Sequence, residues 1–357
     1  MTPAARSARS RLGRIVVGLL VALLAAACGS PAGEPAPTAP SADSAAAVPV
    51  GPLAQQLPGE VSVDGAWVHL QALQRIADEN GGTRAAGTPG YEASVEYVAG
   101  VLRSAGFQVS TPTFAASDDD DGGAAGTGRN VVAQTSTGNP DAVVMIGAHL
   151  DSVPEGPGIV DNGSGVASLL EIATRLGADP EVQNTVRFAF FGDEESGAVG
   201  STGYVESLPA GDLEKIKLYL NVDMVASPNG GYFAQGGEGR DAEEAGPAGS
   251  ATIGRVLAEQ LAAAGVTAPE IVEFVGDDES PFIGAGIPVG GAENGDAKEK
   301  TAQQARAWGG QAGEVYDPCY HQACDRLDNV NRDVLDRYLR AVAGTVARFA
   351  TSTVQLR

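Results

Sequence analysis

Three apolar, strand-like runs constrain the fold of this chain more than any other feature of its sequence. They lie at residues 143–148, 186–191 and 218–222. Each run leads within a few residues to side chains that can bind a metal: His149, the pair Glu194 and Glu195, and Asp223. Helical patterns alternate with these runs, which predicts a mostly parallel sheet covered by helices on both faces. The predicted fold class is therefore α/β, a three-layer α/β/α sandwich around a mostly parallel mixed sheet.

The remaining pattern places the other elements around this sheet. Helices are expected at residues 65–79, 88–104, 163–176, 201–208, 250–264 and 333–350. Strands are expected at residues 107–114, 130–135, 142–148, 185–191, 217–222 and 271–275. Asp64 is expected to cap the first helix, and Pro89 fits the first turn of the second.

The first 27 residues are typical of an export signal rather than of a folded element. Four arginines, at positions 6, 9, 11 and 14, precede an apolar run at 15–27. This run is too short to cross a bilayer comfortably, as expected of a signal peptide. The small residues before Cys28 resemble a bacterial lipobox, which implies lipidation of Cys28 and an anchor at the outer face of the cell membrane. The alternative is a plain secretory signal with an incidental cysteine.

The chain after the signal divides into a tether and a single domain. Residues 28–60 are rich in Pro, Ala and Ser, which predicts a flexible linker with little that could form a core. Residues 61–357 show no internal repeat and no second shift in composition. They are expected to form one domain.

The acidic balance limits the partners of this domain. The formal net charge is -22, and removal of the arginine-rich signal leaves 19 basic against 45 acidic residues, or about -26. Nucleic acid and anionic lipid are poor partners for such a surface, and cationic ligands are better ones. Part of the charge is the run at 118–121, which is expected to be a solvated loop, with a calcium site as the alternative.

Cys319 and Cys324 are the two cysteines that remain if Cys28 carries lipid. Outside the cytoplasm two cysteines this close are expected to pair, and two buried free thiols are the alternative. The bond would enclose Tyr320 and His321. Its expected role is to fix their loop, because closing so short a loop adds only modest stability.

The polar residues that follow the strands suit a metal site. In an open α/β sheet, ligands bind in the crevice outside the carboxyl ends of the strands. Two histidines and four carboxylates are expected there: His149, His321, Asp161, Glu194, Glu195 and Asp223. Zinc accepts imidazole nitrogen and carboxylate oxygen, and two-metal sites hold their ions about 3.5–4 Å apart. The sequence therefore predicts a metallohydrolase with a pair of zinc ions.

The residues around these candidates allow a division of roles. Asp161 precedes a segment whose glycines, at 163 and 165, permit the tight turn that a bridging ligand needs. Of the adjacent Glu194 and Glu195, one can bind metal while the other faces the water as general base. Each candidate taken singly also has an ordinary explanation, such as a solvated Glu pair or Asp223 as a helix cap. The third histidine, His69, has no partner motif and is expected to be structural.

Five ordered segments carry a family resemblance. They are GAHLDS (147–152), DNGSGVASLLE (161–171), FGDEESGAVGS (191–201), NVDMV (221–225) and DPCYHQACD (317–325). These segments resemble the M28 family of zinc aminopeptidases, and within it the small secreted aminopeptidases of Streptomyces. The likeness runs from about Trp67 to the end of the chain. It implies the zinc-exopeptidase type of fold and makes residues 61–357 an M28 peptidase catalytic domain.

The resemblance implies a role for each site residue. Two zinc ions would be held by His149 and Asp223 on one side, by Glu195 and His321 on the other, and by Asp161 as the bridge. Glu194 matches the general base that activates the metal-bridging water, and Tyr320 matches a tyrosine that hydrogen-bonds the oxyanion. The resemblance also implies a cis peptide after the bridging aspartate, at Asn162, and a disulfide between Cys319 and Cys324.

The substrate pocket departs from the family pattern. We place four residues at this pocket: Glu293, Gly276, Asp277 and Met224. Where the Streptomyces enzymes carry a substrate-binding arginine this chain has residues 275–279, VGDDE, and where they carry an aromatic residue it has Glu293. A strict preference for Leu or Phe is therefore not expected. We hypothesise that Glu293, with Asp277 or Asp278, favours Lys or Arg at the substrate N-terminus.

Calcium is a further metal that some relatives bind. Asp336 fits one position of that site, but Arg340 stands where another carboxylate would be expected. The predicted cofactors are therefore two Zn²⁺ ions. Calcium is a further candidate, at a site that would lack this carboxylate.

Together these observations predict a dizinc aminopeptidase on the outer cell surface. Its partners would be peptides with a free N-terminus and, through Cys28, the membrane, and it would act as a monomer. One alternative is a related enzyme, either a carboxypeptidase or a one-zinc glutaminyl cyclase, although both metal half-sites are complete. Another is a lipid-anchored binding protein without catalysis, which would need neither Glu194 nor Tyr320.

Overall fold

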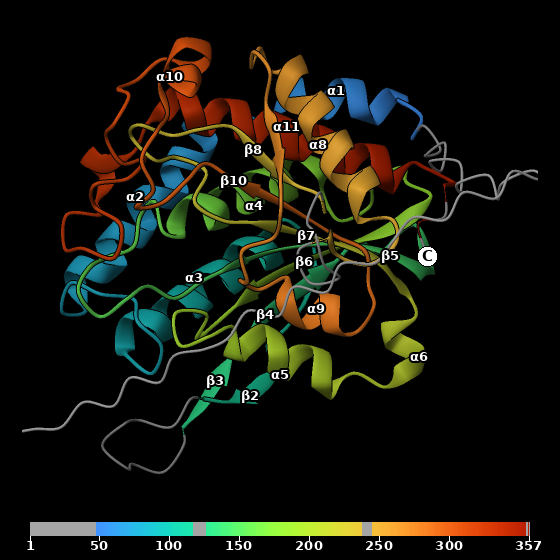
Figure 1. The fold of residues 1–357 in the computed structure, drawn as a ribbon. Helices are drawn as coiled ribbons and strands as arrows, with labels where there is room; N and C mark the ends of the chain where they lie inside the picture. Colours follow the sequence, from blue (N-terminus) through green and yellow to red (C-terminus); the bar gives the residue numbers. More distant parts are fainter. Residues whose placement is uncertain (1–47, 117–125, 238–244, 355, 357) are drawn as a thin grey trace, which may run out of the picture. The chain divides into compact units, whose positions relative to one another are not determined.

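In a computed structural model of the chain, the residues that the structure describes form an eight-stranded mixed sheet between two layers of helices (Figure 1). The strands stand in the order β1-β4-β6-β5-β7-β10-β8-β9. Their bounds in this order are Gln108–Ser110, Val131–Gln134, Asn184–Phe191, Asn139–His149, Ile216–Val222, Val289–Glu293, Phe233–Gln235 and Glu270–Val272. Strands β6, β5, β7 and β10 run parallel, whereas β4 and β8 pair antiparallel with their inner neighbours. The predicted α/β class with a mostly parallel mixed sheet is confirmed.

The structure describes residues 48–116, 126–237, 245–354 and 356. The predicted signal peptide at 1–27, the lipidation site Cys28 and the acidic run at 118–121 lie outside the described residues. A separate antiparallel pair is formed by β2 (Thr113–Ala115) and β3 (Thr127–Arg129). Within the described ranges, every helix is too short or too polar to cross a membrane.

Both faces of the central strands are buried, which accounts for their continuous apolar runs. Successive side chains of a strand point to opposite faces of the sheet. In β5, Ile146 packs into the larger of two hydrophobic cores and Met145 into the smaller one. The neighbouring strand β6 repeats this division with Phe190 and Phe191.

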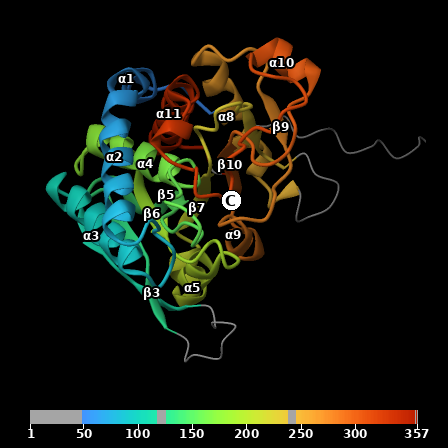
Figure 2. The same ribbon diagram turned by 90° about the vertical axis from the view of Figure 1, so that its left-hand side faces the viewer.

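The two cores are covered by different helices. The larger core lies under α1 (Pro52–Glu60), α2 (Val63–Glu79), α3 (Pro89–Ser104), α4 (Gly163–Leu176), α8 (Ser250–Ala263) and α11 (Arg332–Ala350). The smaller core lies under α5 (Val199–Ser207), α6 (Ala210–Leu213) and α9 (Ser280–Gly284). Helices α2, α3 and α4 pack against one another at one side of the sheet (Figure 2). The C-terminal segment adds α10 (Ala302–Trp308) and a 3₁₀ turn, η1 (Leu327–Asn329).

Side-chain caps determine where the first predicted helices begin. Ser62, and not Asp64 as predicted, caps α2, because the backbone N–H of Gly65 donates to the Ser62 hydroxyl over 3.1 Å. The helix starts at Val63, whose side chain packs against the larger core, so Asp64 falls in the first turn. Thr88 caps α3, and Pro89 occupies its first turn as predicted.

The predicted linker at 28–60 extends too far toward the domain. Residues 52–60 form helix α1, which packs along α11. Leu57 is fully buried, and Arg340 donates a hydrogen bond of 2.8 Å to the carbonyl of Pro58. The short segment carries Leu53 and Leu57 four residues apart, on one face of a helix, amid the prolines and glycines that suggested a tether.

The sequence analysis missed the short strands β8 and β10 and the helices α9 and α10. Strand β10 lies inside the sheet between β7 and β8, although its sequence, VGGAE, contains two glycines. A Cβ atom at Gly290 would stand 2.4 Å from Ile253, and one at Gly291 would stand 1.8 Å from the Gln235 side chain. The glycines are required by neighbours that are distant in sequence, and the carboxyl end of this missed strand carries Glu293.

Candidate metal centre

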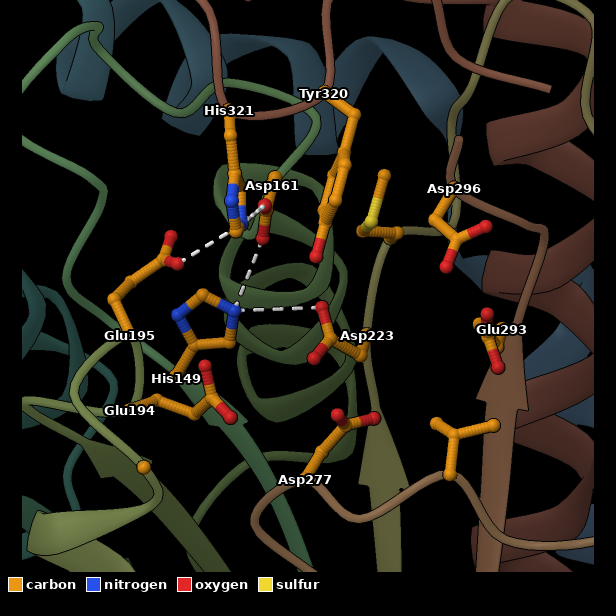
Figure 3. Close-up of a pocket in the computed structure, with 13 residues that line it drawn as sticks. His149, Asp161, Glu194, Glu195, Asp223, Asp277, Glu293, Asp296, Tyr320 and His321 are labelled. Carbon is orange, nitrogen blue, oxygen red and sulfur yellow. Dashed lines mark ion pairs between the residues drawn. The ribbon is translucent and has the colours of Figure 1, made fainter. Parts of the chain in front are cut away.

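A pocket of about 250 Å³ opens at the carboxyl ends of the parallel strands. All the predicted metal ligands and both predicted catalytic residues line it: His149, Asp161, Glu194, Glu195, Asp223, Tyr320 and His321 (Figure 3). His149 is the last residue of β5, and Asp223 follows β7 directly. The turn after β6 brings Glu194 and Glu195, whereas His321 comes from the C-terminal segment. Residues separated by more than 170 positions therefore meet in one pocket, as predicted.

The candidate ligands form two groups that share Asp161. In the first group, His149 Nε2 lies 3.2 Å from Asp161 Oδ1 and 3.4 Å from Asp223 Oδ1. In the second, His321 Nε2 lies 3.3 Å from Asp161 Oδ2 and 3.0 Å from Glu195 Oε2. Each oxygen of one carboxylate thus faces a different histidine, which is the arrangement expected of a ligand that bridges two ions (Figure 3).

Several buried polar atoms of these groups have no hydrogen-bond partner among the described residues. They are His149 Nδ1, Glu195 Oε1 and Asp223 Oδ1. Burial of an unpaired polar atom is costly, and a bound cation would offset this cost for the two carboxylate oxygens. Ligand atoms of His149, Asp161 and Glu195 also lie within 4.8 Å of one another. Imidazole nitrogen and carboxylate oxygen are donors that zinc accepts, so the residues present fit zinc.

The pKa values describe a site with an excess of negative charge. Burial, together with repulsion from Asp278 and Asp223, raises the pKa of Glu194 to about 9. Hydrogen bonds to Asp161 and Glu195 raise the pKa of His321 to about 10. Both shifts favour binding of protons, and a metal cation would supply the same compensating charge.

Asn162 fixes the turn that follows Asp161. The peptide bond between Asp161 and Asn162 is cis, as the resemblance implied. The Asn162 side chain accepts hydrogen bonds from the backbone N–H groups of Gly165 and Met224, and it donates to the carbonyl of Val222 over 2.9 Å. It therefore caps α4 and also ties this helix to the end of β7. The sequence analysis gave Asn162 no such role.

Asp151 is a buried carboxylate that positions several site residues and was not predicted. Its two oxygens accept hydrogen bonds from the backbone N–H groups of Glu194, at 3.2 Å, and Glu195, at 3.3 Å. Asp151 Oδ1 also lies 3.6 Å from His149 Nδ1. A carboxylate on the far nitrogen of a ligand histidine orients the ring. Its position two residues after His149 was the signal that could have identified it.

Asp325 and Arg84 hold the loop before α4 and were also missed. Asp325 accepts hydrogen bonds from the backbone N–H groups of Val160, at 2.8 Å, and Asp161, at 3.0 Å. The guanidinium of Arg84 is fully buried and donates to three carbonyl oxygens of the segment from Leu150 to Gly158. The loop is thus fixed from both sides by side chains remote in sequence.

The loop of Tyr320 and His321 is closed by a disulfide. Cys319 and Cys324 are bonded, which confirms the predicted pair. The rings of Tyr320 and His321 stack with their centroids 3.8 Å apart. The backbone N–H of Cys319 donates to Asp317 over 2.8 Å, which anchors the start of the loop.

Three of the four predicted substrate-pocket residues line the pocket. Glu293, Asp277 and Met224 do so, together with Val275 and Asp296, which the sequence analysis did not name. Gly276 does not, because the chain turns there with φ +106° and this residue lines a neighbouring cavity instead.

Two residues outside the pocket have local partners. His69 makes a 2.7 Å hydrogen bond to the Tyr97 hydroxyl, in agreement with its predicted structural role. Asp336, the candidate for calcium, forms an ion pair with Arg340 one helical turn away, at 2.8 Å. Its carboxylate is therefore already paired.

Known proteins resemble this chain in both sequence and fold. Residues 130–346 match the model of peptidase family M28. The chain is 41% identical over 316 residues to leupeptin-inactivating enzyme 1 of Streptomyces exfoliatus, covering 87% of this chain and 67% of that protein. It is 36% identical over 430 residues to the probable lipoprotein aminopeptidase LpqL of Mycobacterium tuberculosis, covering 82% of this chain and 86% of that protein.

Among solved structures, an aminopeptidase from Aneurinibacillus sp. strain AM-1 is similar with a TM-score of 0.64 and 18% identity. The match covers 85% of this chain and 97% of that chain, and at this identity it supports the fold alone. The family match spans the strands and loops that build the pocket, and the relatives extend the likeness over most of the domain. The chain belongs to peptidase family M28.

Proposed function

We propose that this peptidase is a dizinc aminopeptidase that hydrolyses the N-terminal peptide bond of peptides. The observation that carries the proposal is the geometry of Asp161, whose two oxygens lie beside two separate histidine–carboxylate groups. His149 and Asp223 would hold one ion, Glu195 and His321 the other, with Asp161 between them. Bound zinc ions would supply Lewis acidity and lower the pKa of a water molecule. The aminopeptidase relatives support this assignment.

Glu194 is the proposed general base. Glu194 lines the pocket. Its backbone N–H donates a hydrogen bond to Asp151, which fixes it beside the proposed ligand Glu195. The carboxylate takes a proton from the attacking water and delivers it to the nitrogen of the leaving amine as the C–N bond breaks. Metal cations held by the neighbouring ligands would lower the raised pKa of Glu194 and keep its carboxyl deprotonated before the attack.

Tyr320 is the proposed donor to the oxyanion. Burial and the nearby carboxylate of Asp161 raise the pKa of Tyr320, so its hydroxyl stays protonated at neutral pH. A hydroxyl held in the pocket can donate to the carbonyl oxygen as it gains negative charge. The disulfide-closed loop keeps this hydroxyl beside the ligands.

The acidic pocket also explains a requirement for a free N-terminus. A protonated α-amine is attracted by the carboxylates of Glu194 and Asp223, and acetylation removes this charge. The proposal places the enzyme outside the cell, attached through lipidated Cys28, and the likeness to the probable lipoprotein aminopeptidase LpqL supports it. We further propose that it acts as a monomer.

The test measures release of free amino acids from peptides with free and with acetylated N-termini. The purified mature domain is chelated and then assayed with and without added zinc, beside Glu194→Gln. Zinc-dependent release from free N-termini alone is expected, with kcat lowered about 10²–10⁴-fold in the variant and zinc content unchanged. The exposed Glu181→Gln is the matched control for loss of one carboxylate.

The alternatives give different results in the same assay. Release from the C-terminus would identify a carboxypeptidase. Cyclisation of N-terminal glutamine without peptide hydrolysis would identify a glutaminyl cyclase. If no reaction occurs when zinc is fully bound, the protein would be a binding protein without catalysis.

A further inference from the structure

The pocket contains more carboxylates than two metal ions can balance. Two divalent ions carry four positive charges, which Asp161, Glu195, Asp223 and Glu194 together match. Three further acidic residues line the pocket: Asp277, Glu293 and Asp296. In Figure 3 they lie on the sides of the pocket away from Glu195 and His321. Lysine and arginine are absent from the described residues that line it.

Glu293 is placed to meet a cation. It ends β10, beside β7, whose own end leads into the ligand Asp223. Gln235 donates to Glu293 Oε2 over 2.9 Å and orients the carboxylate. Among the described residues, Oε1 accepts no hydrogen bond and is free for a ligand. Burial and repulsion from Asp223 raise the pKa of Glu293 to about 7, so an adjacent cation would offset an unfavourable charge.

Asp277 and Asp296 differ in how much they can add to cation binding at Glu293. The backbone N–H of Asp277 donates to Glu279, but within the described residues the Asp277 carboxylate has no hydrogen-bond or ion-pair partner. Asp296 lies 3.9 Å from Lys298, whose side chain is 69% exposed, so this pair neutralises Asp296 only weakly. Glu293 and Asp277 are therefore better placed than Asp296 to bind a cation.

Room for a long side chain continues past Glu293. A second cavity of about 380 Å³ shares Glu293 and Val275 with the pocket. Phe233 and Tyr316 give it apolar walls, and its charged lining, besides Glu293, is Glu270, Glu273, Glu299 and the exposed Lys298. Lys and Arg carry an apolar stem and a charged head, and such a lining suits both parts.

We propose that Glu293, assisted by Asp277, forms a cation-binding subsite that selects Lys or Arg as the N-terminal residue of the substrate. This inference rests on the proposed aminopeptidase activity. The side chain of that residue extends along Met224 and Val275, and its ammonium or guanidinium group meets the free oxygen of Glu293. Substrates with leucine are accepted without this ion pair.

The test compares substrates that differ in charge but not in shape. Arginine and citrulline anilides form one pair, lysine and norleucine anilides a second, and leucine anilide reports the basal activity. In the zinc-loaded wild type, kcat/KM for arginine is expected to exceed that for citrulline about ten- to one-hundredfold. Glu293→Gln should bring this ratio close to one, and the leucine turnover of the same variant serves as the reference for its other substrates. Asp277→Asn should lower the ratio less, and the exposed Glu206→Gln should not alter it.

Equal turnover of arginine and citrulline by the wild type, or an unchanged ratio in Glu293→Gln, would overturn the inference while leucine hydrolysis still supports the proposed function. Failure to hydrolyse any anilide would count against the proposed function instead. Calorimetric binding of arginine amide and citrulline amide to the zinc-loaded protein then tests the subsite separately. Equal affinity for the two amides would also overturn it.

Discussion

At the scale of single residues, the proposed metal centre depends most on Asp161. Its two oxygens face the two histidines, its backbone N–H is bound by Asp325, and Asn162 fixes the turn that follows. Other candidate ligands serve one half of the site each. Loss of the Asp161 carboxylate should therefore disturb both halves together.

Asp161→Asn is expected to lower the zinc content from two ions per chain to one or fewer. The amide keeps the size of the side chain but lacks the negative charge and the second ligand oxygen. Metal analysis after dialysis against buffered zinc measures this directly, without reference to activity. Asp141→Asn, at an exposed position, should retain both ions. Two ions bound with wild-type affinity to the Asp161 variant would contradict the bridging role.

Glu293 should make the stability of the domain depend on pH. Its pKa is about 7 in the folded protein, against an ordinary value of 4.5, chiefly because of burial. Below about pH 4.5 the carboxyl is protonated in both the folded and unfolded states, so it adds no penalty. Between about pH 4.5 and 7 the unfolded state releases this proton while the folded state keeps it, so the stability of the folded state falls with rising pH and levels off above about 7.

The free energy of unfolding of Glu293→Gln, measured relative to that of wild type, should therefore increase by at most about 3 kcal/mol when the pH is raised from 5 to 8. Denaturant unfolding at the two pH values, with equal zinc content, measures the difference. Leu57→Ala, which changes no titratable group, should show the same change in stability at both pH values. A Glu293→Gln effect independent of pH would show that this carboxyl titrates normally.

At the scale of elements, the site depends on strands and on side chains that fix the loops after them. The ends of β5 and β7 supply or lead into ligands, and the end of β10 supplies Glu293. Parallel strands bring these ends to one edge of the sheet. Helix α1 lies apart from the pocket and acts on the stability of the larger core instead.

Leu57→Ala in α1 should destabilise the domain by about 2–5 kcal/mol, because the side chain is fully buried against the larger core. Gln56→Ala, on the exposed side of the same helix, should cost far less. Urea unfolding of the two variants gives the comparison. A Leu57 variant as stable as wild type would show that α1 does not contribute to the stability of the domain.

At the scale of the whole molecule, the folded part begins by Val48, so the proposed lipid at Cys28 stands only twenty residues before it. Val48 is itself buried, and Arg348 of α11 donates a 2.6 Å hydrogen bond to its carbonyl. Residues 48–60 of the predicted linker therefore belong to the folded domain.

Cys28→Ala should release the protein from the cell surface without changing its folded domain. The substitution removes the only proposed site of lipid attachment, and within the described residues no helix could replace the anchor. When cells that produce the full chain are fractionated, the variant should be found in the medium and the wild type in the membrane. A variant that stays with the membrane although its mass shows that the signal at residues 1–27 has been removed would contradict the proposed anchor.

The sequence by itself determined the fold class and the identity of the candidate ligands. Strands buried on both faces are mostly apolar, so residues 143–148 and, despite Arg187, residues 186–191 were recognisable. Helix α4 was predicted with its observed bounds. The ligands were recognisable because chemistry limits them to a few residue types in a fixed order. The family match confirms the family that these segments indicated.

Only the tertiary structure decided features that depend on distant neighbours. β10 was missed because Ile253 and Gln235 leave no space for side chains at its glycines. α1 was missed because nine residues rich in Pro and Gln carry too weak a local signal, and burial of Leu57 against α11 stabilises them. Asp151, Asn162 and Arg84 act through backbone groups, which no pattern of residue types reveals. Local periodicity is encoded in neighbouring residues, whereas a contact such as that of Asp151 with Glu194, 43 positions away, exists only once the chain has folded.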